Sequence, residues 1–350
     1  MSVEFPPLVI RAGPEARRRL SEGWNWSLFD VLVGASAGPR WLVLGELDRI
    51  LIGLLQATPR TSPIHLLGSS SGSWRFLAYC QRDPLQSIRT LEDAYIEADW
   101  THNRPLDERG RTALKILDAI APDGTELEQD RFRLHIVTAR CRSILASENY
   151  YLQFLGILLA AGLTAWNRSR LGWLVSRALF SDPRDPLPAR LEDIATRRWP
   201  LRKDNLRQVL LASGAIPLVL PGVRDIPGGP TGCLRDGGLV DYHFDQFQLD
   251  TNGLILYPHF HHHLQPSWLE HRHPRSRVNQ DVVDRMVVLH PDPRWIASLP
   301  TGALPDRQDA YRCDETERIR RWREAVRRSQ ELAQALHSVI ASGDIQPLEL

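Results

Sequence analysis

The 350-residue sequence has little net charge, few cysteines and no long apolar segment. Its 43 Lys and Arg residues nearly balance 42 Asp and Glu residues, and the formal net charge is +1. This balance provides no general field that would attract nucleic acid, so we expect no nucleic-acid partner. The four cysteines are far apart and show no Cys-x-x-Cys spacing, which indicates reduced thiols rather than a disulfide framework.

The apolar segments are also too short to cross a membrane. The most apolar run, residues 152–166, has about 15 residues, whereas a spanning helix needs roughly 20. The N-terminal residues lack the basic region and the long apolar stretch of a signal peptide. We therefore expect a cytoplasmic protein. The apolar run is simplest to interpret as a core or lid helix; the alternatives are an acyl-chain groove or peripheral contact with a membrane surface.

Hydrophobic residues make up 43% of the chain, which is enough to build a large packed core. Short apolar runs typical of strands alternate with helical patterns. These runs are residues 29–33, 64–67, 134–137, 218–220, 254–257 and 287–290. Because strand and helix alternate along the chain, the sequence predicts an α/β fold with a mostly parallel sheet covered on both faces.

Three regions depart from this alternation. Residues 81–130 are charged and predict a helical elaboration, whereas residues 181–203 are rich in proline and charge and predict a surface connection or lid. Residues 310–341 predict one long amphipathic helix. We expect a catalytic domain over residues 1–300 and a C-terminal helical extension, residues 301–350, that packs on it.

Two copies of the pattern Gly-x-Ser-x-Gly each follow a strand-like run and precede a helical pattern. They read Gly34-Ala35-Ser36-Ala37-Gly38 and Gly68-Ser69-Ser70-Ser71-Gly72. In serine hydrolases this pattern lets a strand turn sharply into a helix with the serine at the apex. Pro39 suits the first turn of a helix, so the amides before it predict an anion-binding loop rather than a second nucleophile.

A third motif, Asp236-Gly237-Gly238, follows the segment 210–223. With its glycine-rich loop, Gly-x-Ser-x-Gly and Asp-Gly-Gly in that order, the chain resembles the patatin-like phospholipases over roughly residues 28–260. The resemblance implies a three-layer sandwich around a mostly parallel sheet. It also implies a Ser–Asp dyad that cleaves carboxylic esters of lipid or lipid-like substrates through an acyl-enzyme, without a metal or an organic cofactor.

The resemblance further implies roles for named residues. Ser70 is expected as the nucleophile and Asp236 as the base that accepts its proton. The expected oxyanion-hole residues are Gly34, Ala35, Ser36, Ala37, Gly38 and Ser71, and the expected supporting residues are Arg40, Gly68, Gly72, Gly237 and Gly238. The family's loop usually has consecutive glycines, and an Asn and a Pro often follow its Asp motif. Here the residues after the motif include Asp241, Tyr242 and His243.

Two other functions stay open from the residues alone. An α/β-hydrolase-type esterase would use a Ser–Asp–His triad with His243 or His259 as the base. A non-catalytic lipid- or membrane-binding protein could use the same scaffold. The histidines between residues 259 and 273 favour structural or surface roles over a metal site, because consecutive histidines do not ensure converging ligands. The arginines between residues 318 and 328 favour a self-paired, solvated face over binding to anionic lipid.

Overall fold

Five neighbouring parallel strands form the centre of the main sheet. In spatial order they are β12 (Met286–Pro291), β11 (Leu254–Pro258), β2 (Phe29–Gly34), β3 (Ile64–Ser69) and β4 (Phe132–Cys141). The computed structural model describes residues 5–101, 104–122, 125–270, 279–343 and 345–350. Nearly all residues of the five strands are buried, so both faces of the sheet are covered, and this burial explains their continuous apolar sequences.

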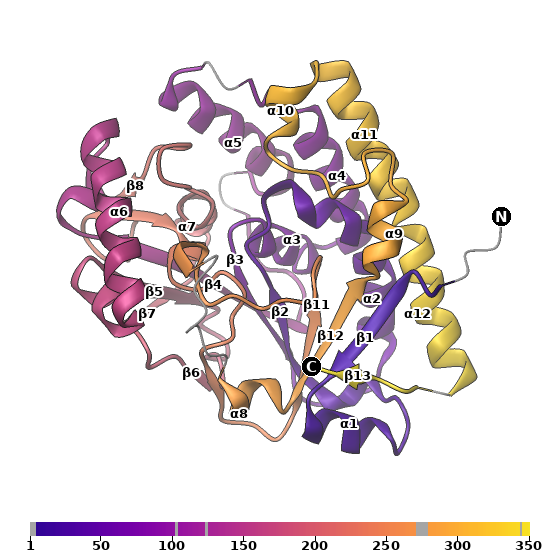
Figure 1. Ribbon diagram of the computed structural model, residues 1–350. Helices are drawn as coiled ribbons and strands as arrows, with labels where there is room; N and C mark the ends of the chain where they lie inside the picture. Colours follow the sequence, from indigo (N-terminus) through magenta and orange to yellow (C-terminus); the bar gives the residue numbers. More distant parts are fainter. Residues whose placement is uncertain (1–4, 102–103, 123–124, 271–278, 344) are drawn as a thin grey trace.

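Further strands extend this centre on both sides and make the sheet mixed (Figure 1). Beside β12 lie β1 (Leu8–Ala12), which is antiparallel to it, and β13 (Leu348–Glu349). Beside β4 lie the antiparallel β5 (Val175–Ser181) and then β7 (Thr196–Pro200). A branch from β4 consists of β9 (Cys233–Asp236) and β8 (Val223–Arg224), and a separate pair consists of β6 (Ala189–Arg190) and β10 (Gln248–Leu249). The fold is therefore α/β with a mostly parallel sheet, as the sequence predicts.

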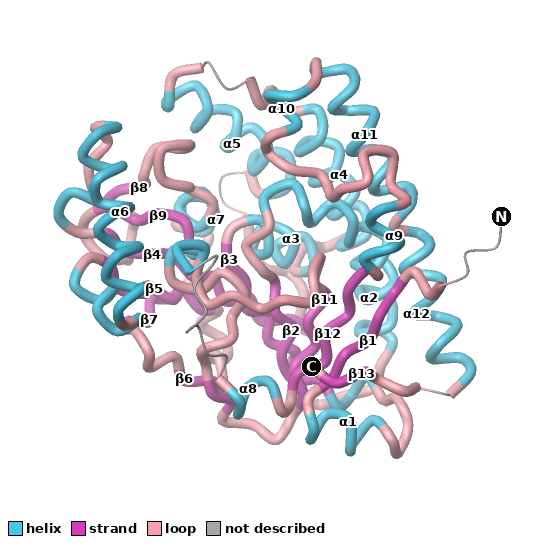
Figure 2. The backbone as a smooth tube through the Cα atoms, in the orientation of Figure 1, coloured by secondary structure: helices cyan, strands magenta, loops and turns pink. Residues whose placement is uncertain are grey.

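Helices surround the strands (Figure 2). The α-helices are α1 (Pro14–Leu20), α2 (Gly45–Ala57), α3 (Ser71–Tyr79), α4 (Pro84–Glu97), α5 (Leu106–Ile120), α6 (Tyr150–Trp166), α7 (Leu206–Ser213), α8 (Gln280–Val283), α9 (Pro293–Ala297), α10 (Asp309–Arg312), α11 (Glu315–Arg328) and α12 (Gln330–Ser342). The 3₁₀ segments are η1 (Trp26–Leu28), η2 (Gly38–Leu44), η3 (Ser143–Ala146), η4 (Arg168–Trp173), η5 (Gly237–Leu239) and η6 (Trp268–Glu270). The predicted helical elaboration at 81–130 contains α4 and α5. Within the described residues, no helix combines the length and apolar character needed to cross a bilayer.

A buried ion pair fixes α3, the helix that follows the second Gly-x-Ser-x-Gly. Arg75 donates two hydrogen bonds, of 2.8 and 2.6 Å, to the Asp48 carboxylate of α2, and the Tyr79 hydroxyl donates a third of 2.9 Å. Because a buried charge is costly without a partner, this ion pair fixes α3 relative to α2, while α3 packs against the strands β2, β3 and β4.

The structure confirms five of the six predicted strands and shows that the prediction at residues 218–220 is wrong. That segment forms a turn, in which Leu218 has a φ of 65° and its amide donates to the Gln153 side chain. The strands β1, β5, β7 and β9 are not among those predicted from the sequence. The predicted surface connection at 181–203 includes β7, an edge strand whose exposed arginines hide any apolar pattern.

The predicted single helix over 310–341 is also wrong in detail, because α10, α11 and α12 occupy the region. The break between α11 and α12 lies at Ser329, whose hydroxyl accepts from the Glu46 amide at 3.1 Å and donates to Val326 at 2.7 Å. The extension packs on η2, α2 and α4. The arginine face is largely self-paired as expected: Glu317, for example, accepts hydrogen bonds from Arg320 and Arg321.

Candidate active site

Ser70 occupies the turn between β3 and α3, where the sequence places the apex of its second Gly-x-Ser-x-Gly. Its φ of 53° and ψ of −133° are strained for a residue with a side chain, which is typical of a nucleophile elbow. Gly72 allows the close approach of α3 to β2, since a Cβ there would lie 2.1 Å from the Gly34 oxygen. The small residues of the pattern thus hold Ser70 at a sharp turn between a buried strand and a buried helix.

The sheet brings Asp236 beside Ser70. On β4, Val137 pairs with Ser69 of β3, and the next residue, Thr138, pairs with Asp236 of β9. Because β3 and β9 both pair with β4, their ends meet. The Ser70 hydroxyl donates a 2.8 Å hydrogen bond to Oδ2 of Asp236, so the predicted nucleophile and base are in direct contact.

Burial makes this carboxylate a stronger base than an ordinary aspartate. Asp236 is 3% exposed and Ser70 is 5% exposed. Burial raises the pKa of Asp236 to about 6, opposed by the hydrogen bond from Ser70, by the bond from the Gly238 amide and by the positive charge of Arg307. The Gly238 amide lies 2.7 Å from Oδ1 and leaves Oδ2 for the serine. A base with a pKa near neutral is suited to accepting a proton at physiological pH.

Gly237 explains why the aspartate is followed by glycine. A Cβ at Gly237 would lie 2.3 Å from the Val137 oxygen and 2.8 Å from the Ser69 Cβ. The chain therefore turns tightly against β3 and β4 directly after Asp236, and this turn brings the Gly238 amide back to the carboxylate.

The predicted oxyanion loop requires correction. The Ser36 amide donates to the Tyr242 oxygen at 3.1 Å, and the Ala37 amide donates to the Ser71 hydroxyl at 3.1 Å. Gly34 is the last residue of β2, and Ala35 lies buried directly after it. Ser36 and Ala37 are therefore not available as oxyanion donors.

Two residues of the predicted set stand at the start of a helical segment. Gly38 is the first residue of η2 and Ser71 is the first residue of α3. The first amides of a helix have no partner within it, so they can donate to a developing negative charge.

Ser36 supports the loop through its side chain. Its hydroxyl lies 2.6 Å from the Ser69 hydroxyl, which in turn donates to the Asp241 oxygen at 2.9 Å. Ser69 thus uses its proton on Asp241 and accepts from Ser36. The first Gly-x-Ser-x-Gly therefore places a serine whose side chain bonds to Ser69 rather than to the Asp236 carboxylate.

Three supporting residues were not found from the sequence. The Ser213 hydroxyl accepts from the Ser70 amide at 2.9 Å and donates to Val137 at 2.7 Å. The fully buried Arg177 donates two hydrogen bonds, of 2.5 and 2.7 Å, to Asp241, which fixes the segment after the Asp-Gly-Gly motif. These contacts join residues that are far apart in the chain and carry no motif.

Arg307 is the third residue, and it comes from the C-terminal extension. It is exposed, its Cγ lies 3.8 Å from where a Cβ on Gly38 would be, and its charge lowers the pKa of Asp236. Among the described residues, its side chain forms no hydrogen bond or ion pair. Arg40, the basic residue that the resemblance implies, instead pairs with Asp306 at 2.6 Å. Arg307, rather than Arg40, is thus the arginine whose charge lowers the pKa of Asp236.

The histidines do not complete a triad. His243 Nδ1 accepts from the Gln265 amide at 3.0 Å, and His259 Nδ1 accepts from the His261 amide at 3.0 Å. Burial lowers the pKa of both rings, that of His259 to about 3. No histidine in the described ranges forms a hydrogen bond with Ser70 or Asp236, so the alternative with a histidine base lacks its central contact.

A run of three histidines offers the one group of at least three candidate metal ligands found in the described part of the chain. One ring nitrogen from each of His261, His262 and His263 lies within 4.8 Å of the other two. The rings of His261 and His262 are stacked, with centroids 4.6 Å apart. His271 and His273 lie outside the described residues. The cluster is separate from the Ser70–Asp236 pair, to which it makes no hydrogen bond.

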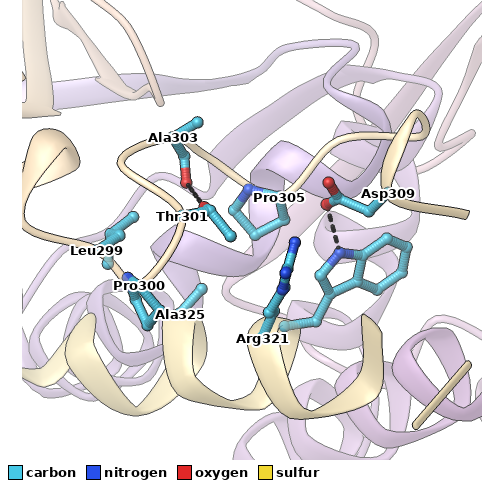
Figure 3. A pocket seen from close by; sticks show the side chains of 9 residues that line it. Leu299, Pro300, Thr301, Ala303, Pro305, Asp309, Arg321 and Ala325 are labelled. Carbon is cyan, nitrogen blue, oxygen red and sulfur yellow. Dashed lines mark hydrogen bonds between the residues drawn. The ribbon is translucent and has the colours of Figure 1, made fainter. Parts of the chain in front are cut away.

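Two hollows lie near the C-terminal extension. One of about 480 Å³ is lined by residues that include Arg40, His261 and His262. The other, of about 10 Å³, lies between α11 and the preceding loop, where Figure 3 shows Pro305, Asp309 and Arg321 around it. Its size suits about one water molecule. Neither hollow is lined by Ser70 or Asp236.

Fold and site together define an α/β protein with a serine–aspartate pair at a strand-to-helix turn. Comparison with protein-family models and with curated proteins gives no match to this chain.

Proposed function

We propose that this chain is a serine hydrolase that cleaves carboxylic esters of lipid or lipid-like acyl substrates, with the three-layer fold and dyad of the patatin-like phospholipases. One observation carries the proposal: Ser70, at a strained strand-to-helix turn, donates a 2.8 Å hydrogen bond to the buried carboxylate of Asp236. The order of the three motifs and the mostly parallel sheet support the family assignment.

The chemistry follows from this pair. Ser70 Oγ attacks the carbonyl carbon of the ester, and its proton passes to Oδ2 of Asp236. The carbonyl oxygen becomes an oxyanion, which the Gly38 and Ser71 amides would stabilise; one such donor contributes about 3–4 kcal/mol. When the tetrahedral intermediate collapses, the ester C–O bond breaks, and the leaving alkoxide takes the proton from Asp236 and departs as an alcohol.

Water completes the cycle. It attacks the acyl carbon and gives a proton to Asp236. The second intermediate breaks its bond to Ser70 Oγ, which takes that proton back, and a carboxylic acid is released. All proton transfers use Oδ2, the oxygen that already faces the serine.

The lipid character of the substrate rests on the family resemblance and on one surface feature. Helix α6 exposes large apolar side chains to solvent, as expected for a protein that meets water-insoluble substrates.

Labelling with a fluorophosphonate probe tests the proposal. We expect the probe to modify Ser70, and we expect Ser70→Ala to abolish labelling and to lower esterase activity by about a thousandfold or more. Asp236→Asn keeps the hydroxyl but removes the base, so labelling should become slow. Ser36→Ala removes the serine of the first Gly-x-Ser-x-Gly, and the label should still be found on Ser70.

Two results would contradict the proposal. Labelling at Ser36 that survives Ser70→Ala would transfer the nucleophile to the first motif. A wild-type protein that resists the probe and cleaves neither short- nor long-chain esters would favour a non-catalytic lipid-binding protein.

A further inference from the structure

Helix α6 exposes its large apolar side chains to solvent, which is the reverse of an ordinary surface helix. Its 17 residues contain no charged side chain. The face toward the protein consists of Gln153, Gly156, Ala160 and Thr164, which are buried. The solvent face carries larger apolar residues that are between 45% and 79% exposed: Tyr150, Tyr151, Leu152, Phe154, Leu155, Leu158, Leu159 and Trp166. A surface helix normally buries its large residues, so this arrangement indicates a surface that is covered by something else.

The helix is firmly held in this orientation. Asn149 caps its first turn by accepting from the amides of Tyr151 and Leu152. Gln153 donates to the Ser147 oxygen at 2.6 Å and accepts from the Leu218 amide. Figure 1 places α6 at the outer edge of the molecule, and the helix contacts η3, η4 and η6. The apolar face is thus a fixed part of the surface.

Positive charge lies at both ends of this face. At the C-terminal end, the Arg170 guanidinium lies 3.7 Å from the Trp166 ring centroid and 5.6 Å from that of Trp173, which is 67% exposed. The exposed Arg142 contacts Gly172 in the same segment at 3.4 Å. At the N-terminal end, the exposed Arg224 donates to the Ala146 oxygen at 2.6 Å.

We propose that α6 and Trp173 dock the protein on the surface of a lipid bilayer that contains anionic headgroups. Tyrosine and tryptophan at both ends of an apolar helix are typical of the membrane–water interface, and arginines beside them match anionic headgroups. The helix lies flat on the bilayer, because its protein-facing residues hold it along its whole length. This surface is independent of the proposed catalysis.

The same charges argue against a second copy of the chain as the occupant. In a two-fold pair of α6 helices, the arginines at the ends of one copy would face those of the other copy. Like charges at the border of an apolar interface oppose association, whereas an anionic bilayer neutralises them.

Co-sedimentation of the full chain with vesicles tests the docking surface. Ser70→Ala serves as the parent, because it removes hydrolysis and keeps α6. We expect it to bind phosphatidylcholine vesicles that contain phosphatidylglycerol. The double substitution Leu155→Asp and Leu158→Asp should weaken binding by about tenfold or more. Leu85→Asp changes an exposed leucine on α4 and should leave binding unchanged.

A second variant and a second measurement keep the test decisive. Arg170→Glu should weaken binding to the anionic vesicles by more than it weakens binding to pure phosphatidylcholine. It also remains informative if the double variant fails to fold. The proposal is overturned if the parent binds neither type of vesicle or if neither variant changes binding. It is also overturned if light scattering shows a dimer that the α6 substitutions dissociate. Because every arm uses an inactive parent, failure of docking leaves ester hydrolysis by Ser70 and Asp236 untouched and removes only the support that α6 gives to a lipid substrate.

Discussion

The pH dependence of ester hydrolysis gives the sharpest test of Asp236 as the base. Its carboxylate must be ionised to accept the serine proton, and burial raises its pKa to about 6. Such a group is about nine-tenths ionised at pH 7 and about one-tenth ionised at pH 5, so kcat/KM should fall about tenfold between these two pH values. If the base were an exposed aspartate with an ordinary pKa near 4, kcat/KM would fall by less than about 1.1-fold over the same interval.

The assay is kcat/KM for a soluble short-chain ester, measured from about pH 4.5 to about pH 8.5, with Ser70→Ala as the blank. The acid limb of this pH profile, the part in which kcat/KM falls as the pH is lowered, should bend near pH 6. A limb well below pH 5 would refute the argument that burial activates the carboxylate.

Substitutions of Arg307 identify the group that titrates. Its positive charge lowers the pKa of Asp236, so Arg307→Gln should move the acid limb to higher pH, whereas Arg307→Lys should leave it near its place. Arg312→Gln removes an exposed positive charge from the same region, in α10, and serves as the control. A limb that moves to lower pH in Arg307→Gln would contradict the assignment of Asp236 as the titrating group.

A histidine base would also give a limb near pH 6 if its pKa were ordinary, so it needs its own control. Burial lowers the pKa of His243 and of His259 well below that value. We therefore expect His243→Asn and His259→Asn, made separately, to keep the limb where it is. A limb that disappears in either variant would favour the triad.

Three further predictions concern stability. Gly72→Ala should prevent folding, because its Cβ would lie 2.1 Å from a backbone oxygen of β2. The matched control is Gly53→Ala, which lies in open space on α2 and should raise the free energy of unfolding, measured by urea titration, by about 0.5–1 kcal/mol. Arg177→Met should lower the free energy of unfolding by about 3–5 kcal/mol, because it leaves the buried Asp241 charge without its partner; an unchanged urea midpoint would contradict this. Asp236→Asn should stabilise the protein by up to about 3 kcal/mol above pH 6 and by little below pH 4. The reason is that burial raises the pKa of Asp236, so ionising the carboxylate in the native state becomes more costly as the pH rises through that window. Equal thermal stability of the variant and the wild type at pH 8 would argue against a desolvated carboxylate.

The elbow could be predicted from the sequence because every requirement for it is local. An apolar run, small residues and a helical pattern follow one another within about 15 positions around Ser70. The central strands were predictable for the same reason, since both of their faces are buried. At 218–220 the apolar pattern failed, because Leu218 adopts a positive φ and bonds to a side chain of α6 rather than to a neighbouring strand.

The details of the oxyanion loop could not be predicted, because a motif locates a turn without choosing among its amides. The Ala37 amide is used by the Ser71 hydroxyl, 34 residues away, and the Ser36 amide by Tyr242. Both partners come from distant segments of the chain that only the folded sheet brings near. Arg307 illustrates the same limit, since it reaches Gly38 from a segment without a motif.

In the proposed mechanism, the Asp236 carboxylate acts as the base without a histidine. Burial alone would raise the pKa of Asp236 but leave its orientation free, whereas hydrogen bonds alone would fix its orientation but weaken it as a base. Here the serine and the Gly238 amide hold one oxygen each, and burial still outweighs their effect on the pKa. Keeping such a carboxylate buried costs folding stability, so the loops around it must be held by other contacts. The Arg177–Asp241 ion pair and the Ser36–Ser69 hydrogen bond meet that need, and both lie on the segments that position the dyad.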